Sequence, residues 1–301
     1  MQKISMNVIP RTIYGDIVGL PDPILLGITI HYYNHSDETL YMKIFGSGPS
    51  PWNSNAVELG SLASGANAYI NLDNFLSRTK PTEALTEELT LTLKGYMDSG
   101  YSDLKYEFSR TCTAVFIKSD DGTWTTDHSN NFDDETVEGW AVALIDTTDT
   151  DPTISCDIAT DYVLSVPYSL KMTIKGVDWF GGGLVKCWSR GKFYKNFTTP
   201  NKDVVYAIAN LRISGYVSGS IYGKQLKVLR DSTTLIYLGK EPDHVSSEYF
   251  PKNKWVRLVF PLPKNTDLTV NLVIACLGEW VANGERLYIY GWLDDFKIIS
   301  K

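Results

Sequence analysis

The sequence predicts an all-β protein made of two β-sandwich domains, the second of them a jelly roll. Aromatic residues make up 12% of the chain and are led by 18 tyrosines, and this composition favours strands over helices. Short runs of alternating apolar and polar residues are separated by Gly, Pro, Asn and Asp, the usual pattern of strands and turns. With 301 residues, the chain is long enough for two domains of ordinary size.

The first part of the chain contains a series of short strand-like runs. One stretch, residues 79–89, has a weak helical pattern, but Leu89, Leu91 and Leu93 alternate with polar residues and therefore predict a strand there. Turn residues divide the series at a spacing typical of a β-sandwich. We expect an immunoglobulin- or fibronectin-like sandwich. Its strands are predicted within residues 24–33, 39–46, 56–72, 87–98 and 105–119.

A polar stretch, residues 118–131, interrupts this series and contains almost no aliphatic side chains. Domain boundaries usually fall in such polar segments. The prediction is therefore a first domain over residues 1–125 and a second over residues 126–301.

The second part is predicted to form about nine strands joined by long loops, as expected for a two-sheet antiparallel jelly roll. It begins with "NFDDETVEGWAVALID" and ends with "RLYIYGWLDDFKII". The runs between these two ends cover residues 168–176, 182–197, 204–217, 225–231, 234–239, 254–263 and 268–280.

Four of these pieces occur in an order that resembles galactose-binding-like jelly-roll carbohydrate-binding modules. They are the opening "NFDDETVEGW", the early "YSLKMTIKG", the late "KWVRLVFPLP" and the closing "YIYGWLDDFKII". The resemblance covers about residues 130–301 and concerns architecture and motif order. It departs from the usual pattern where Thr136, Val137 and Glu138 lengthen the opening, and in its richness in Lys and Tyr.

The closing strand carries an acidic residue on its apolar side. Alternation places Asp294 on the same face as Phe296 and Ile298. A buried carboxylate is costly unless it is neutralised or paired. Asp294 could bond to backbone N–H groups or to a nearby Lys, a bulge could turn it to solvent, or it could bind a cation.

The resemblance implies a structural Ca²⁺ ion held by Asp133 and Asp294, with the first and last strands of the domain side by side. Ca²⁺ takes six to eight oxygen ligands, and backbone carbonyls can supply those that two carboxylates do not. If the register slips by one residue, neighbouring acids could replace these two. Those neighbours are Asp134, Glu135 and Asp295.

Aromatic residues of the second domain are the candidate ligand-binding residues. Sugar recognition uses aromatic faces against pyranose C–H surfaces, together with polar groups that bind the hydroxyls. Trp188 alternates against Val185 and Cys187 and is expected to point outward, and Trp280 is predicted in a loop. Trp140, Trp255 and Trp292 are expected to pack within the sandwich. The full candidate set is Trp179, Phe180, Trp188, Tyr194, Tyr222 and Trp280.

Other classes of function receive little support from the sequence. The formal net charge of −7 and the lack of a dense Lys/Arg run argue against nucleic-acid binding. No apolar run is long enough to span a bilayer, and no secretory signal is visible. No GxSxG, HExxH or P-loop motif and no pair of acids facing across a cleft suggests an enzyme.

The sequence therefore predicts a non-catalytic protein that recognises carbohydrate on a polysaccharide or a cell surface. The alternative is a structural component of a virion, surface layer or appendage, whose sandwiches pack against protein neighbours. An extracellular or virion-associated location fits both expectations.

Overall fold

The computed structural model describes residues 2–9, 11–147, 152–175, 185–216, 220–230, 233–238, 255–281 and 288–301. These residues are mostly strand, and one short 3-10 helix, η1 (Ile17–Gly19), occurs among them. The chain divides into two compact units, Met1–Ser119 and Asp120–Lys301, at a point inside the polar stretch 118–131. No helix in the described part is long and apolar enough to cross a membrane.

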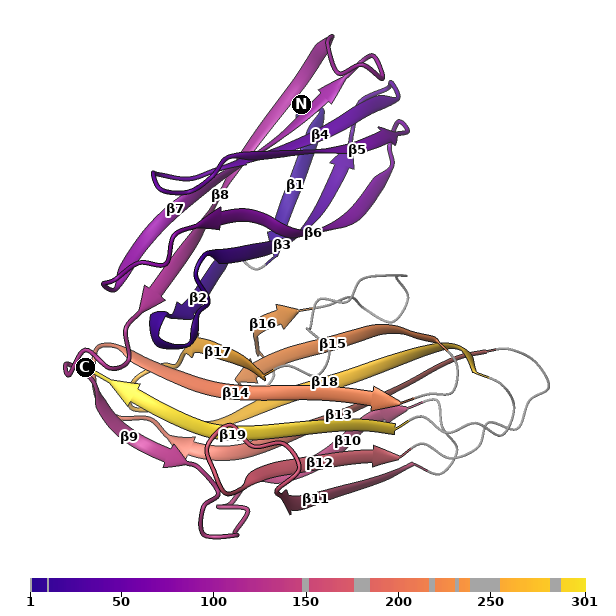
Figure 1. Cartoon of the computed structure of the whole chain (residues 1–301). Helices are drawn as coiled ribbons and strands as arrows, with labels where there is room; N and C mark the ends of the chain where they lie inside the picture. Colours follow the sequence, from indigo (N-terminus) through magenta and orange to yellow (C-terminus); the bar gives the residue numbers. More distant parts are fainter. Residues whose placement is uncertain are drawn as a thin grey trace. The chain divides into compact units, whose positions relative to one another are not determined.

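Unit 1 is a sandwich of two sheets (Figure 1). Strand β2 runs parallel to β8, and the other pairings are antiparallel. The strand order resembles that of immunoglobulin-type sandwiches. One sheet is β1 (Ile4–Ile9), β3 (Ile24–Asn34) and β6 (Asn67–Arg78), and the other is β2 (Thr12–Asp16), β8 (Leu104–Ile117), β7 (Leu85–Tyr96), β4 (Leu40–Ser47) and β5 (Asn55–Leu62).

Alternation of side chains explains how these strands form a core. In β3, Ile24, Leu26, Ile28 and Ile30 are buried, and the residues between them are more exposed. Successive side chains of a strand point to opposite faces, so each strand gives one row to the core. The strand predicted at the end of the 79–89 segment is confirmed, because β7 begins at Leu85.

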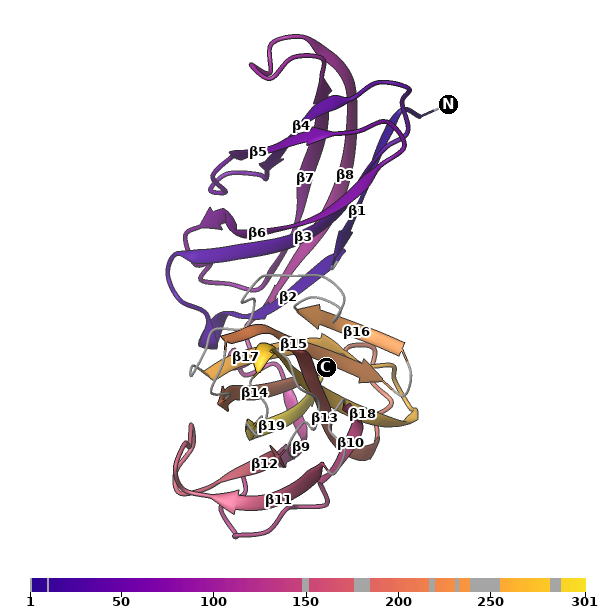
Figure 2. The same cartoon turned by 90° about the vertical axis from the view of Figure 1, so that its right-hand side faces the viewer.

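Unit 2 consists of two antiparallel sheets that form the predicted jelly-roll layers (Figures 1 and 2). The first sheet has the order β10 (Ala141–Thr147), β13 (Val185–Thr198), β18 (Asp267–Val281), β15 (Ser220–Arg230) and β16 (Thr233–Leu238). The second has the order β11 (Thr153–Ala159), β12 (Ser169–Lys175), β19 (Tyr288–Ser300), β14 (Val205–Tyr216) and β17 (Trp255–Pro261), with β9 (Thr125–Asn130) paired to β19.

Two glycines let the sheets of unit 2 approach closely. A Cβ atom on Gly191 of β13 would lie 2.5 Å from Ile174 Cδ1 of β12, in the other sheet. A Cβ atom on Gly291 of β19 would lie 2.5 Å from Ile274 Cδ1 of β18. Each sheet therefore places an isoleucine over a glycine of the opposite sheet, and a larger residue at either glycine would push the layers apart.

Three parts of unit 2 differ from the sequence-based prediction or were not foreseen. Strand β9 lies inside the polar stretch that was predicted to contain the domain boundary, and β11 was not predicted at all. The strand at the start of the unit that lies beside β19 is β9, whereas the predicted opening run forms β10 in the other sheet. Trp280 belongs to strand β18 rather than to a loop.

Candidate functional site

One face of the first sheet of unit 2 carries a group of polar and aromatic side chains, and on this face Asn271 and Val273 are buried whereas Tyr194 and Asn196 are accessible. In β13, Phe193 and Phe197 are buried in the core. The alternate residues Lys192, Tyr194 and Asn196 therefore point to the outer side. We call this surface the Tyr194 face; it comprises Lys192, Tyr194 and Asn196 of β13 with Thr269 and Asn271 of β18.

The neighbouring strands surround Tyr194 with one small and one polar residue. Ala141 of β10 lies opposite Tyr194 in the register, and Ala143 lies opposite Lys192. On the other side, Asn271 of β18 is opposite Tyr194. The half-buried tyrosine ring is therefore bordered by a small alanine on one strand and by an amide on the other.

Polar contacts hold the side chains of the Tyr194 face in place. Lys192 Nζ donates to Asn271 Oδ1 at 2.8 Å and lies 4.9 Å from the centre of the Tyr194 ring, a cation–π distance. Thr269 Oγ1 donates to Asn196 Oδ1 at 2.7 Å. Within the described part of the chain, the Tyr194 hydroxyl and Asn196 Nδ2 donate to no protein oxygen.

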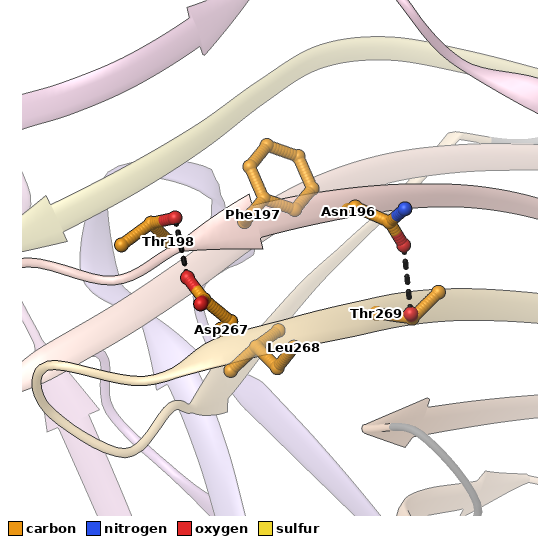
Figure 3. A pocket seen from close by; sticks show the side chains of 6 residues that line it. All are labelled: Asn196, Phe197, Thr198, Asp267, Leu268 and Thr269. Atoms are coloured by element: carbon orange, nitrogen blue, oxygen red, sulfur yellow. Dashed lines mark hydrogen bonds between the residues drawn. The ribbon is translucent and has the colours of Figure 1, made fainter.

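A shallow cavity of about 410 Å³ extends this surface along β13 and β18 (Figure 3). Thr198 Oγ1 donates to Asp267 Oδ1 at 2.6 Å within it. Two polar pairs that join β13 to β18 therefore line the cavity. They are Asn196 with Thr269, and Thr198 with Asp267. Its lining residues are Asn196, Phe197, Thr198, Asp267, Leu268 and Thr269.

The structure places four of the six predicted ligand-binding residues in one sheet. Trp188 and Tyr194 belong to β13, Tyr222 to β15 and Trp280 to β18. Tyr194 is on the Tyr194 face, whereas the side chains of Trp188, Tyr222 and Trp280 lie outside the described part. Trp179 and Phe180 lie outside the described residues altogether.

The polar side chains of the Tyr194 face and of the cavity beside it were not foreseen from the sequence. Lys192, Asn196 and Thr198 alternate with buried residues in β13, and Asp267, Thr269 and Asn271 do the same in β18. The alternation within each strand can be seen in the sequence. The pairing of the two strands cannot, because it brings together Asn196 and Thr269, which are 73 positions apart in the chain.

Comparison with solved structures finds β-sandwich carbohydrate-binding modules, the class that the C-terminal sequence resembles. One, from a study of promiscuous specificity in the β-sandwich superfamily of these modules, aligns over 98% of this chain and 97% of its own, with 13% identity and a TM-score of 0.36. The CBM22-1 xylan-binding domain of Paenibacillus barcinonensis Xyn10C aligns over 58% of this chain and 93% of that domain, with 16% identity and a TM-score of 0.28.

A third structure is TmCBM27, a carbohydrate-binding module described as recognising mannan. It aligns over 60% of this chain and 99% of its own, with 10% identity and a TM-score of 0.33. No family model and no curated protein matches the chain. At these TM-scores and identities the matches carry no information about function.

Asp294, the acidic residue of the closing strand, is completely buried. Its Oδ2 atom accepts hydrogen bonds from the main-chain N–H groups of Leu164 (2.7 Å) and Ser165 (2.9 Å), and its Oδ1 accepts from the Ser165 hydroxyl (2.6 Å). Burial raises the pKa of Asp294, although these hydrogen bonds act in the opposite direction. Of the alternatives considered for Asp294, the structure shows bonding to backbone N–H groups.

The second predicted calcium ligand has different partners. Asp133 is exposed and accepts a hydrogen bond from the side chain of Asn131. Asp295 forms ion pairs with Lys297 (2.7 Å) and Arg257 (3.5 Å). Among the described residues, no group of three or more His, Cys, Asp or Glu side chains could hold a metal ion.

These contacts do not fit a Ca²⁺ ion shared by Asp133 and Asp294. The ion needs a cage of oxygen ligands, whereas both oxygens of Asp294 face N–H and O–H donors. The two carboxylates also have separate partners. A structural calcium ion therefore stays a prediction.

Proposed function

We propose that the chain is a non-catalytic carbohydrate-recognition protein that binds a polysaccharide or a cell-surface glycan at the Tyr194 face. The observation that carries the proposal is the outward Tyr194 ring, held by Lys192 and followed along the strand by the amide of Asn196. The proposed ligand stacks a pyranose ring near Tyr194, and its hydroxyls bond to the amide and hydroxyl groups on either side.

The shape of the surface favours a sugar chain over a small enclosed ligand. The cavity beside the Tyr194 face is shallow and lies along two adjacent strands. Paired polar groups recur on it, with Asn196 and Thr269 at one step and Thr198 and Asp267 at the next. A polysaccharide lying along such a surface meets hydroxyl-binding groups at successive sugar rings, and Lys192 can also bind a sugar carboxylate.

Binding to an array of polysaccharides and glycans tests this proposal. Tyr194→Ala and Trp188→Ala are expected to weaken binding of the best ligand by about tenfold, the effect of losing about 1.4 kcal/mol of aromatic contact. Tyr290→Ala is the matched control, because Tyr290 is also a half-buried tyrosine but lies on strand β19 of the other sheet. Binding that survives both variants would contradict the proposed site.

The alternative is a structural or assembly protein, and one feature of unit 2 favours it. Leu164 and Val166 are 47% and 78% exposed in the loop between β11 and β12. Contiguous exposed apolar patches mark surfaces where proteins pack against neighbours, and these two side chains lie close together in the sequence. Self-association into rings or filaments, detected by light scattering or electron microscopy, together with no binding on the array, would support this alternative.

A further inference from the structure

Lys195 of β13 reaches into the segment that opens unit 2. Its Nζ atom donates to Asn130 Oδ1 at 3.1 Å and to the main-chain oxygen of Glu138. The ammonium group also lies 5.2 Å from the centre of the Phe197 ring. Lys195 is partly buried, and burial lowers its pKa, while the charge of Glu138 acts in the opposite direction.

The oxygen atoms around this ammonium belong to a hydrogen-bonded network. Asn130, which is buried, accepts from Trp140 Nε1 at 3.2 Å and donates to the Glu138 carboxylate. The Glu138 carboxylate also accepts from the main-chain N–H of Phe132 at 2.8 Å. The opening segment, defined here as residues 130–140, therefore closes on itself around Asn130 and Glu138.

The backbone of the opening segment is strained where it turns around this network. Phe132 has φ 62° and Glu138 has φ 47°, in the left-handed region that residues with a side chain seldom adopt. Gly139 follows with φ 78°, and a Cβ atom there would lie 3.6 Å from Lys195 Cε. Such conformations persist only where surrounding contacts stabilise them.

We propose that the Lys195 ammonium is the resident cation of the opening segment, which folds around it and is thereby joined to strand β13. A lysine ammonium is a compact point charge with three N–H donors. It meets an amide oxygen and a main-chain oxygen, and the Glu138 carboxylate balances its charge. These are the oxygen types that attract a hard cation, and here a side chain supplies the positive charge.

The same lysine is a positioning residue for the Tyr194 face, a consequence that rests on the proposed function. Lys195 lies between Tyr194 and Asn196 in β13 and points to the opposite side of the strand. By joining this part of β13 to the opening segment, it holds the backbone from which both proposed ligand-binding side chains project.

Thermal unfolding of the full chain tests the cation role without any ligand, so its result is independent of the proposed function. Lys195→Met keeps most of the length and the apolar stem of the side chain but removes the charge. It removes the lysine donor from the main-chain oxygen of Glu138 and leaves Asn130 Oδ1 with Trp140 Nε1 alone, and it is expected to lower the Tm of unit 2 by about 3–8 °C. Lys264→Met is the control, because Lys264 forms an exposed ion pair with Asp203 and its loss should change Tm little.

Chemical rescue separates a cation requirement from a packing effect. Lys195→Ala leaves space for a small cation beside the same oxygens. Ammonium or methylammonium chloride is expected to raise the Tm of this variant more than sodium chloride does at equal ionic strength, and to have no such selective effect on the wild type. Should Lys195→Ala fail to fold, the Tm of Lys195→Met is compared with that of the double variant Lys195→Met/Glu138→Gln. The double variant is expected to recover part of the lost Tm, because it also removes the unbalanced carboxylate charge.

Two results would overturn the proposal. One is an unchanged Tm in Lys195→Met, or a loss that neither the ammonium salts nor the Glu138→Gln change reduces. The other is a wild-type Tm that EDTA lowers, that Ca²⁺ restores, and whose EDTA response is lost in Glu138→Gln, since a metal ion at Glu138 and not Lys195 would then be the cation. A wild-type Tm insensitive to EDTA, together with selective rescue by ammonium, is the expected outcome.

Discussion

Asp294 holds a loop in place through the loop's main chain. Its carboxylate receives two N–H groups and one hydroxyl from residues 164 and 165. Desolvation nevertheless raises its pKa, so burial of the charge outweighs these bonds. Hydrogen-exchange protection in the loop therefore reports the role of Asp294 more directly than the free energy of unfolding does.

Replacing Asp294 is expected to release the loop it holds. In Asp294→Ala, the N–H groups of Leu164 and Ser165 lose their acceptor, and their hydrogen-exchange protection should fall by at least tenfold, equivalent to about 1.4 kcal/mol. Asp203→Ala is the control, since Asp203 is an exposed acid in a surface ion pair. Unchanged protection at both amides would show that the loop is held by other contacts.

The burial of Asp294 could be predicted from the sequence, but its partners could not. Alternation with Phe296 and Ile298 placed it on the inner face, and all three are buried in the structure. Its donors come from residues 129 and 130 positions earlier in the chain. Local periodicity carries no information about contacts at that separation, so several partners remained open at the sequence level.

At the scale of elements, the packing of the two sheets in unit 2 depends on complementary sizes. Gly191 faces Ile174, and Gly291 faces Ile274. Well-packed cores lose stability when a side chain is enlarged, typically by about 1–3 kcal/mol. The spacing between the layers is therefore sensitive to a single methyl group at these positions.

Gly191→Ala is expected to lower the free energy of unfolding by about 1–3 kcal/mol. Its new Cβ would approach Ile174 Cδ1 to 2.5 Å, and Ile174→Val removes that methyl group. The double variant should therefore be more stable than the sum of the two single changes predicts, as measured by urea denaturation. Simple additivity would show that another contact resists the added methyl group.

Strands in which apolar and polar residues alternate could be predicted from the sequence, whereas strands made mostly of polar residues could not. Strands such as β3 and β7 bury one complete row of side chains, so their pattern is plain in the sequence. Strand β9 (Thr125–Asn130) buries little besides Asn130 and is a strand because β19 pairs with it. Its structure comes from a partner at the far end of the chain, which a polar local sequence does not reveal.

For the whole molecule, the important feature is that each unit has a core of its own. The buried apolar cluster of unit 1 contains residues from Ile4 to Phe116, and that of unit 2 contains residues from Phe132 to Ile298. Two domains with a polar boundary were foreseen from the sequence. The start of the second unit was placed at residue 126, which would cut into β9.

The two units are expected to fold as separate fragments, 1–119 and 120–301, because neither core uses residues of the other. Each fragment should show one cooperative transition in differential scanning calorimetry. A fragment that begins at residue 131 loses β9 and Asn130 and should melt at a lower temperature than fragment 120–301. Equal melting temperatures would mean that β9 contributes nothing to stability.

The way Asp294 binds its loop makes the conformation at residues 164 and 165 depend mainly on main-chain groups. Main-chain N–H groups are the same for almost every amino acid, and among the described residues only Ser165 contributes a side chain to the carboxylate. Leu164 and Val166 are exposed, so their replacement leaves the anchor intact. This loop can therefore change its outward residues while keeping its conformation, which makes it a natural position for diversification and for the engineering of new binding specificities.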